Sequence, residues 1–310
     1  MYDIIIIGAG PAGLTAAIYA RRAEKSVLVI EKESFGGQIT KSPRVENYPG
    51  SRSISGAELG DMLFEHATDL GAEIELDTVI GIKGETADLT VICEGGEHRA
   101  KTVIIATGSE HRELDLGGAD KFTGEGISYC AVCDGAFYKG KKVVVIGGGN
   151  TALQEAIMLS DIASEVVILQ DLPLLTGEKS LQNVIAEKEN VRVVTGARVS
   201  WLETDEGGRL TGLVYEEIDG KFMLAADGIF VAIGQVPKLD QFADVIELDE
   251  RGYAAAGEDC IPKSTVEGIY VAGDCRTKKI RQVTTATADG AVAALAAINF
   301  IDNLWRRRKY

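Results

Sequence analysis

Short runs of consecutive apolar residues alternate with helical patterns along this chain. Tyr2–Ile7 is the first such run and Ser26–Ile30 is the second, and between them Leu14–Arg22 has helical spacing. Strands that are apolar at every position are buried on both faces, which is typical of a parallel sheet covered by helices. The pattern therefore predicts an α/β fold.

The same order returns in the middle of the chain. Lys142–Ile146 and Glu165–Leu169 read as strands, and Leu153–Ser160 between them reads as a helix. Each copy has a glycine turn after its first strand, and Gly147 follows Gly8 by 139 residues. That distance is far longer than the period of a solenoid. We predict two Rossmann-like, three-layer dinucleotide-binding domains.

The later strands predict that one domain interrupts the other. Val103–Gly108 and Gly228–Gly234 are apolar strands that end at glycine, and each would close the domain begun before it. Gly268–Asp274 is a further strand, and the Ala-rich helix Arg281–Ala297 follows it. If this last pair completes the first domain, the second domain is inserted into the first.

The length agrees with this division. The chain has 310 residues, and about 150 residues per domain suggests two domains. With 45% hydrophobic and 25% charged residues, the composition is that of an ordinary globular protein. We place the first domain at residues 1–113 and 247–310 and the second at 114–246.

Charge and cysteine content exclude several classes of protein. The net charge of −15 argues against nucleic acid as a partner, because binding to phosphates needs a basic surface. No apolar run reaches the ~18 residues of a membrane span, and the N-terminus lacks the pattern of a signal peptide. Five cysteines in a chain of this length indicate a reducing compartment rather than a disulfide framework. We expect a cytoplasmic protein without a membrane partner.

The first glycine turn has the spacing G-x-G-x-x-G at Gly8, Gly10 and Gly13, and Glu31 ends the next strand. Gly8 permits the tight turn, Gly10 leaves room for a pyrophosphate, and Gly13 lets helix and strand pack closely. The helix N-terminus supplies N–H groups to the phosphates. The turn predicts a dinucleotide site in which Glu31 accepts hydrogen bonds from a ribose.

The second turn has the spacing G-x-G-x-x-A at Gly147, Gly149 and Ala152. A site for a 2′-phosphate normally has a basic residue after the second strand, but no Arg or Lys occurs there before Lys179. Asp171 at this place would repel such a phosphate. The turn disfavours NADPH in its usual pose, and both an NADH site and an empty, vestigial site fit it.

Cys130 and Cys133 form a C-x-x-C motif that Asp134 follows directly. A structural zinc site needs four ligands, but the chain has no second C-x-x-C motif and contains three histidines. Two thiols at this spacing form a reducible disulfide, and a neighbouring carboxyl group can move protons. We favour a redox dithiol over a zinc site or two buried small residues.

Two nucleotide folds and a dithiol resemble the low-molecular-weight thioredoxin reductases of bacteria over nearly the whole chain. The motif CxxCDG followed shortly by GGGNTA is highly specific for them. The matching segments are Gly8–Gly13, Gly36–Gln38, Glu46–Gly50, Ala106–Gly108, Cys130–Gly135, Gly147–Ala152, Gly268–Asp274 and Arg281-Gln282.

The resemblance implies that the first domain binds FAD. Glu31 would hold the adenosine ribose and Asp274 the ribityl chain, with Arg281 and its neighbours near the isoalloxazine. The full set of cofactor-binding residues that it implies is Gly8, Gly10, Pro11, Ala12, Gly13, Glu31, Gly36, Gly37, Gln38, Asn47, Ala106, Thr107, Gly108, Gly273, Asp274, Arg281, Gln282 and Val283.

The resemblance also implies the roles of the dithiol. Cys133 would lie against the flavin and form the charge-transfer thiolate, Cys130 would attack the disulfide of thioredoxin, and Asp134 would be the proton donor. The family is homodimeric, and its inserted domain rotates so that the dithiol alternates between flavin and thioredoxin.

One part of the family pattern is missing. NADPH-dependent members carry His-Arg-Arg, then three residues, then Arg after the second strand of the second domain. These positions are Gln170, Asp171, Leu172 and Thr176 here. A subset of the family lacks these arginines and takes electrons from reduced ferredoxin. We favour ferredoxin as the donor, with NADH next, and the residues leave NADPH open.

Several basic residues offer contacts to an acidic iron–sulfur protein, namely Lys278, Lys279, Arg281 and Arg306–Lys309. Other functions also stay open at this stage. They are the reduction of a different CxxC protein and a flavin sensor without turnover. An oxidoreductase resembling ferredoxin–NADP reductase is disfavoured, because such enzymes lack the dithiol.

Overall fold

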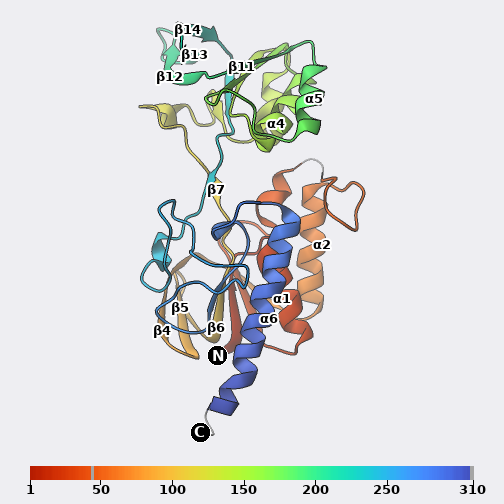
Figure 1. Ribbon diagram of the computed structural model, residues 1–310, viewed down its shortest axis with the longest axis vertical. Helices are drawn as coiled ribbons and strands as arrows, with labels where there is room; N and C mark the ends of the chain where they lie inside the picture. Colours follow the sequence, from red (N-terminus) through yellow and green to blue (C-terminus); the bar gives the residue numbers. More distant parts are fainter. Residues whose placement is uncertain (43–44, 308–310) are drawn as a thin grey trace. The chain divides into compact units, whose positions relative to one another are not determined.

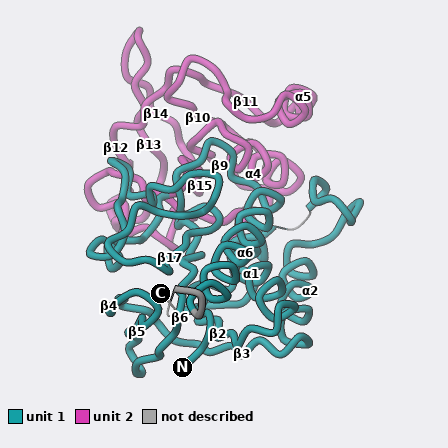
Figure 2. Tube along the Cα trace, turned by 60° about the horizontal axis from the view of Figure 1, so that its bottom comes forward, with its two compact units in different colours: residues 1–110, 236–310 teal, residues 111–235 magenta. Residues whose placement is uncertain are grey.

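The computed structural model describes residues 1–42 and 45–307. The chain divides into two compact units, which Figure 2 shows in two colours. Unit 1 contains residues 1–110 and 236–310, and unit 2 contains residues 111–235. The short strands β7 (Glu110–His111) and β16 (Gln235–Val236) lie where the chain passes from one unit to the other.

The inserted unit ends earlier than the sequence analysis placed it. We expected boundaries near residues 113 and 246, and the structure has them at 110 and 235. The boundary at 235 precedes the expected one at 246 because the residues between them pack in unit 1. Leu239, Phe242, Val245 and Ile246 are buried in a core cluster of unit 1, and Asp240–Phe242 forms the short 3₁₀ helix η4 there.

Unit 1 is built on a seven-stranded sheet in the order β3-β2-β1-β6-β5-β4, with β17 beside β6. β1, β2, β3, β6 and β17 pair in parallel, whereas β4 and β5 pair antiparallel. The strands are β1 (Tyr2–Ile7), β2 (Val27–Glu31), β3 (Glu73–Leu76), β4 (Val79–Glu85), β5 (Asp88–Cys93), β6 (Glu97–Ile105) and β17 (Ile269–Val271).

Three long helices belong to unit 1 (Figure 1). They are α1 (Pro11–Arg22), α2 (Gly56–Asp69) and α6 (Val283–Arg307), with the 3₁₀ turns η1 (Gly37–Lys41) and η5 (Gly273–Cys275). α1 begins at Pro11, earlier than the expected Leu14, because proline suits the first helical position. A capping box between Ser55 and Glu58 starts α2.

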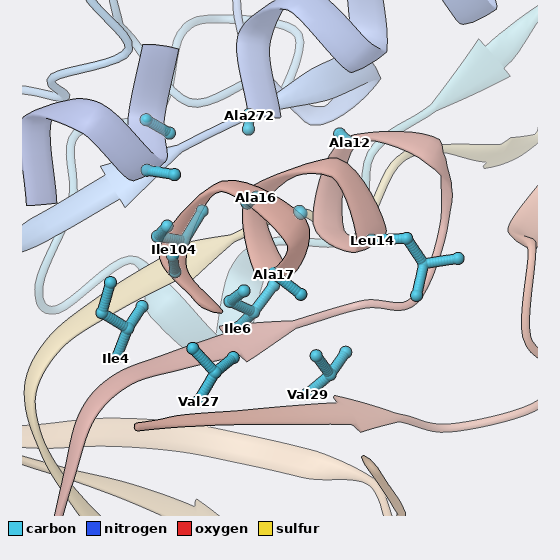
Figure 3. Close-up of a cluster of buried hydrophobic side chains, with 14 of the residues drawn as sticks. Ile4, Ile6, Ala12, Leu14, Ala16, Ala17, Val27, Val29, Ile104 and Ala272 are labelled. Atoms are coloured by element: carbon cyan, nitrogen blue, oxygen red, sulfur yellow. The ribbon is translucent and has the colours of Figure 1, made fainter. Parts of the chain in front are cut away.

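Alanines on α1 pack on the sheet and let α6 approach closely. Figure 3 shows Ala17 beside Ile6, and both are buried in one cluster with Ala12, Ala16 and Ile4. A Cβ atom on Gly290 of α6 would lie 2.1 Å from the Ala12 carbonyl oxygen. This contact fixes the N-terminal end of α1, where the first glycine turn lies.

The apolar character of α6 exceeds what the sequence analysis expected. Val283–Leu304 is long and apolar enough to cross a membrane by length and composition alone. Ala293, Ala294, Ala297 and Ile301 of this helix are buried in the core of unit 1. A core helix meets the same criterion, so α6 is weak evidence for a membrane span.

Unit 2 contains a five-stranded parallel sheet and a three-stranded antiparallel sheet, in the orders β11-β10-β9-β15-β8 and β12-β13-β14. Its strands are β8 (Ile127–Ser128), β9 (Lys142–Ile146), β10 (Glu165–Gln170), β11 (Val191–Thr195), β12 (Arg198–Thr204), β13 (Leu210–Glu217), β14 (Gly220–Ala225) and β15 (Gly228–Val231). Its helices are η2 (Ala119–Phe122), α3 (Ala131–Asp134), η3 (Gly135–Tyr138), α4 (Asn150–Ser160) and α5 (Lys179–Ala186).

Candidate active site

The first glycine turn joins β1 to α1 in unit 1. Gly8 has φ 106°, and its N–H donates to the Ile30 carbonyl at 2.7 Å. A Cβ atom on Gly13 would lie 1.9 Å from the Gly8 carbonyl oxygen. Both positions therefore require glycine, and the turn presents the N-terminus of α1.

The carboxylate of Glu31 is held at this turn. Its Oε2 accepts a hydrogen bond from the Ala9 N–H at 2.7 Å, and its Oε1 accepts one from the Glu33 N–H at 3.0 Å. Each oxygen keeps a second lone pair for a further donor. A Cβ atom on Gly10 would meet nothing closer than Gly37 Cα, at 3.9 Å, so the backbone leaves space in front of the helix.

Three other loops reach the same turn. A Cβ atom on Gly8 would lie 2.5 Å from the Ala106 carbonyl oxygen, one on Gly37 would lie 3.0 Å from Gly10 Cα, and one on Gly273 would lie 2.9 Å from Ala12 Cβ. Gly36 donates its N–H to the Ala9 carbonyl at 2.8 Å. The structure thus gathers Gly8–Gly13, Gly36–Gly37, Ala106 and Gly273, which the sequence analysis assigned to one site.

Asp274 follows Gly273 and carries a buried acceptor. Its Oδ1 has no hydrogen-bond partner among the described residues. Burial raises the pKa of this carboxyl, and the nearby charges of Lys278 and Arg281 oppose the rise. A buried acceptor without a donor is costly, so this oxygen suits a hydroxyl donor of a bound ligand.

Further predicted site residues lie around the start of α6, whose first residue is Val283, and in η1. The Asn47 amide donates to Gln282 Oε1 at 3.1 Å. Arg281 stacks its guanidinium on the Tyr253 ring at 4.0 Å and donates Nε to the Asp274 carbonyl at 3.3 Å. Gln38, in η1, donates its amide to the Ser109 carbonyl at 3.2 Å.

A buried ionic cluster supports the Gly273–Asp274 segment. Asp289 accepts two hydrogen bonds from Arg276, at 2.7 and 2.9 Å, and one from Lys278 Nζ at 2.8 Å. It also accepts the Gly273 N–H at 3.1 Å. Burial alone would raise the pKa of Asp289. The hydrogen bonds from Arg276 and Lys278 outweigh this effect, so the pKa lies below its usual value. Asp289 is therefore a carboxylate that fixes the segment from behind.

In unit 2 the C-x-x-C motif lies at the start of α3. Cys130 is disulfide-bonded, the side chain of Cys133 lies outside the described part of the structure, and Cys93, Cys260 and Cys275 are free. Ser128 donates its hydroxyl to Asp134 Oδ2 at 2.7 Å and accepts the Cys130 N–H at 3.0 Å. Ser128 thus links the predicted proton donor to the backbone of the disulfide.

The second glycine turn keeps the backbone of the first but has different charges around it. Gly147 has φ 127°, and the N–H groups of Thr176 and Gly177 donate to the Gly148 carbonyl at 2.8 and 2.9 Å. Asn150 begins α4 and donates its amide to Glu178 Oε1 at 3.0 Å, while the Glu178 N–H donates back to Asn150 Oδ1 at 2.7 Å. The carboxylate of Glu178 is therefore held by the side chain of the first residue of α4.

The comparisons with known proteins decide the family. Residues 2–290 match the model of the pyridine nucleotide-disulphide oxidoreductase family. The chain belongs to this family. Thioredoxin reductase from Bacillus subtilis is 39% identical over 306 residues, which cover 98% of this chain and 96% of the relative. The solved thioredoxin reductase of Lactococcus lactis has a TM-score of 0.94 and 35% identity, covering 98% of this chain and 100% of that one.

A third solved relative is a ferredoxin-flavin thioredoxin reductase from Clostridium acetobutylicum. It has a TM-score of 0.52 and 31% identity, and the match covers 98% of both chains. These likenesses confirm the family resemblance and the two Rossmann-like domains that the sequence predicted. As a member of this oxidoreductase family, the chain is a flavin-dependent enzyme, and its cofactor is FAD.

The residues of unit 1 fit FAD. The space in front of Gly10 suits a pyrophosphate at a helix N-terminus, and the spare acceptor capacity of Glu31 suits a ribose diol. The buried Asp274 oxygen, which has no hydrogen-bond partner among the described residues, suits a hydroxyl of the ribityl chain.

Four features of the site escaped the sequence analysis. Asp289 and Tyr253 lie far along the chain from the groups they contact, and no motif marks them. The pairing of Asn150 with Glu178 also joins distant residues. The fourth feature, Glu155 on α4, could have been identified from the helical periodicity, because it lies on the same apolar face as Ala152 and Leu159.

Proposed function

We propose that this enzyme reduces the disulfide of thioredoxin, passing electrons from reduced ferredoxin through FAD to a dithiol of Cys130 and Cys133. The bound FAD supplies the redox chemistry, namely acceptance of electrons from a donor and delivery of a pair to a disulfide. The observation that carries the choice of donor is the charge around the second glycine turn.

That turn lacks every arginine that a 2′-phosphate would need. Gln170, Asp171, Leu172 and Thr176 stand at those positions, and Gln170 is buried against Gly148, where a Cβ atom would lie 2.7 Å from its Cδ. Lys179, the next cation, begins α5 and donates to Gln182 Oε1. The carboxylates of Asp171 and Glu178 oppose the phosphates of NADPH, which favours an enzyme that does not use NADPH.

The basic residues that we expected to contact ferredoxin are only partly available. Lys278 is buried and paired with Asp289, and Arg281 is stacked on Tyr253, so neither is a free surface cation. Lys279 is exposed beside the exposed Ile280, and the side chains of Arg306–Lys309 lie outside the described part of the structure. Among the basic residues whose side chains the structure describes, we therefore assign a contact with ferredoxin to Lys279 alone.

The site residues have these roles in the proposal. Glu31 holds the adenosine ribose, Asp274 holds the ribityl chain, and Arg281, Gln282 and Val283 lie near the isoalloxazine. Cys133 receives electrons and Cys130 attacks the disulfide of thioredoxin. Asp134, positioned by Ser128, supplies the proton that the leaving thiolate takes up.

Anaerobic reduction of the purified enzyme tests the donor. The flavin absorption band, near ~450 nm, is followed while NADPH, NADH or reduced ferredoxin is added separately. Ferredoxin should bleach the band and support thioredoxin reduction, and neither pyridine nucleotide should do so. Rapid bleaching by micromolar NADPH would refute the donor assignment, and bleaching by NADH alone would favour the NADH-dependent alternative.

A repair variant makes the same test sharper. Gln170→His, Asp171→Arg, Leu172→Arg and Thr176→Arg together restore the family pattern, and Glu178→Gln removes the carboxylate at the helix. If charge decides the donor, this variant should gain bleaching by NADPH while keeping bleaching by ferredoxin. The variant Glu187→Gln, an exposed change elsewhere in unit 2, is the matched control and should gain nothing.

The dithiol is tested separately. Cys133→Ser should abolish thioredoxin reduction while FAD remains bound, because the electrons then have no disulfide to enter. Activity of this variant would refute the dithiol route and would favour a different acceptor site.

We further propose that the enzyme is a cytoplasmic homodimer, as the family resemblance implies. The sparse cysteines favour a reducing compartment. Light scattering coupled to size-exclusion chromatography measures the oligomeric state, and a mass near the 33.0 kDa of one chain would refute the homodimer.

A further inference from the structure

A buried carboxyl group lies behind the redox motif in unit 2. Glu155 lies on α4, which packs against α3, and its Oε1 accepts the Ala131 N–H at 3.5 Å. Ala131 directly follows Cys130. Oε2 of Glu155 is buried and has no hydrogen-bond partner among the described residues.

The surroundings of Glu155 are mostly apolar. Its helix neighbours Ala152, Leu153, Ala156 and Leu159 belong to a buried cluster with Ala131. Burial raises the pKa of Glu155 to about 7, and only the Ala131 N–H opposes this. The group therefore changes charge near neutral pH, whereas an ordinary glutamate is ionised there.

The elements packed against α4 bring few charges to this place. Besides Cys130 and Cys133, their ionisable groups are Asp134 on α3, Tyr138 on η3, Lys179 on α5, Lys142 on β9 and Glu165 on β10. Asp134 is hydrogen-bonded to Ser128, and Lys142 is paired with Glu165. No ion pair joins any described residue to Glu155.

We propose that Glu155 is a positioning residue that controls the proton affinity of the Cys130 thiol through its own charge. Neutral Glu155 leaves the Cys130 thiol free to ionise. Ionised Glu155, whose carboxyl group lies at the N–H of the residue after Cys130, adds a negative charge that opposes the thiolate. This inference rests on the proposed role of Cys130 as the attacking thiol. Its consequence is that attack on a partner disulfide is favoured while Glu155 keeps its proton.

The chemical step involved is one ionisation. The Cys130 thiol releases a proton and becomes a thiolate, and no electrons move. Because thiolate and not thiol is the nucleophile, the rate of alkylation of Cys130 reports this equilibrium. In that assay the sulfur displaces iodide from iodoacetamide, forming one C–S bond as one C–I bond breaks.

The experiment measures this rate against pH in the FAD-loaded protein carrying Cys133→Ser. That change leaves Cys130 as the one thiol in its tryptic peptide, and mass spectrometry quantifies that peptide. The comparison is between this protein and the same protein with Glu155→Gln, which replaces the carboxyl group by an uncharged amide of the same shape. Neither an electron donor nor thioredoxin is present, so failure of the donor assignment would leave this test intact.

We expect Glu155→Gln to alkylate at the parent rate at pH 6, where Glu155 is mostly protonated. At pH 8 it should be roughly threefold to tenfold faster, which corresponds to half a unit to one unit in the pKa of Cys130. Glu187→Gln should match the parent at both pH values. A ratio that is constant with pH would mean a purely structural role and would overturn the proposal.

A second measurement needs no substitution at Glu155. NMR of ¹³C-labelled glutamate carboxyl groups follows the titration of Glu155 directly, with Glu155→Gln identifying the signal by its loss. A midpoint near 7 supports the proposal, and a midpoint near the ordinary value of about 4.3 overturns it.

Discussion

Gly13→Ala tests the tightest contact of the FAD site. The added methyl group would lie 1.9 Å from the carbonyl oxygen of Gly8 and 3.2 Å from Ile6 Cγ2. Distances below 3.0 Å are essentially never seen for real Cβ atoms, so the Gly8 carbonyl oxygen and α1 must separate by at least 1.1 Å, the difference between 3.0 and 1.9 Å.

The cost of this separation follows from what must move. Overpacking a core usually costs about 1–3 kcal/mol, and the clash with Gly8 is between backbone atoms that cannot change rotamer. We therefore expect a loss of about 3 kcal/mol in the free energy of unfolding, or roughly a hundredfold in the folded-to-unfolded ratio. The same movement displaces the N–H groups at the start of α1 from the phosphates of FAD.

Urea unfolding and the ratio of flavin to protein absorbance measure the two effects. Gly96→Ala is the matched control, because Gly96 lies in the same unit and a Cβ atom there would have nothing within 4 Å. It should keep its FAD and stay within about 1 kcal/mol of the parent. If Gly13→Ala also stays within this limit with full FAD, the close approach of helix and strand is refuted.

Three further outcomes follow from the site. Asp289→Asn should lower the free energy of unfolding by about 3–5 kcal/mol in urea titrations, because it leaves two buried cations underpaired, whereas the exposed Asp302→Asn should change it by less than about 1 kcal/mol. Asp134→Asn should reduce the turnover of thioredoxin by roughly 10²–10⁴-fold with FAD retained. As the pH rises from 4.5 to 7, the parent should lose about 2–3 kcal/mol of unfolding free energy relative to Glu155→Gln. The reason is that Glu155 has a raised pKa in the folded protein, so the unfolded chain releases this proton at a lower pH than the folded protein does.

Each of these outcomes has a contrary result. Equal losses for Asp289→Asn and Asp302→Asn would mean that the buried cluster contributes no more than a surface pair. Undiminished turnover of Asp134→Asn would assign proton donation elsewhere. Parallel pH profiles of stability would place the pKa of Glu155 near its unfolded value.

The sequence predicted the parts of this molecule that local chemistry decides. Tyr2–Ile7 and Lys142–Ile146 are strands with the expected bounds, because uniformly apolar runs next to glycine turns have few other conformations. The gathering of Gly8–Gly13 with Gly273 was predicted from the family resemblance and is present in unit 1. These features depend on residues that are close in sequence or belong to a known motif.

The features that the sequence did not predict depend on contacts between distant segments. The second domain boundary was placed eleven residues late, at 246 rather than 235, because composition does not show that Phe242 is buried in unit 1. Lys278 looked like a surface cation and is buried with Asp289. In each case tertiary packing decides the environment, and local polarity gives no sign of it.

The two glycine turns show why the motif alone does not decide function. Both follow a parallel strand, and both have a later loop that donates backbone N–H groups to the turn. At the first turn the carboxylate of Glu31 is held by the backbone N–H groups of Ala9 and Glu33, and a Cβ atom on Gly10 would meet nothing closer than Gly37 Cα, at 3.9 Å. At the second turn the carboxylate of Glu178 is held by Asn150 at the start of the helix.

An acid at the ribose position favours a dinucleotide, whereas an acid at the phosphate position opposes one. In our proposal, which places Glu31 at the ribose and Glu178 at the phosphate, the same backbone has opposite preferences for a pyrophosphate in the two units. This difference supports a division of labour in which unit 1 holds the cofactor and unit 2 carries the dithiol. It also explains why the Glu178→Gln change belongs in the repair variant, because restoring the arginines alone would leave a negative charge facing the pyrophosphate.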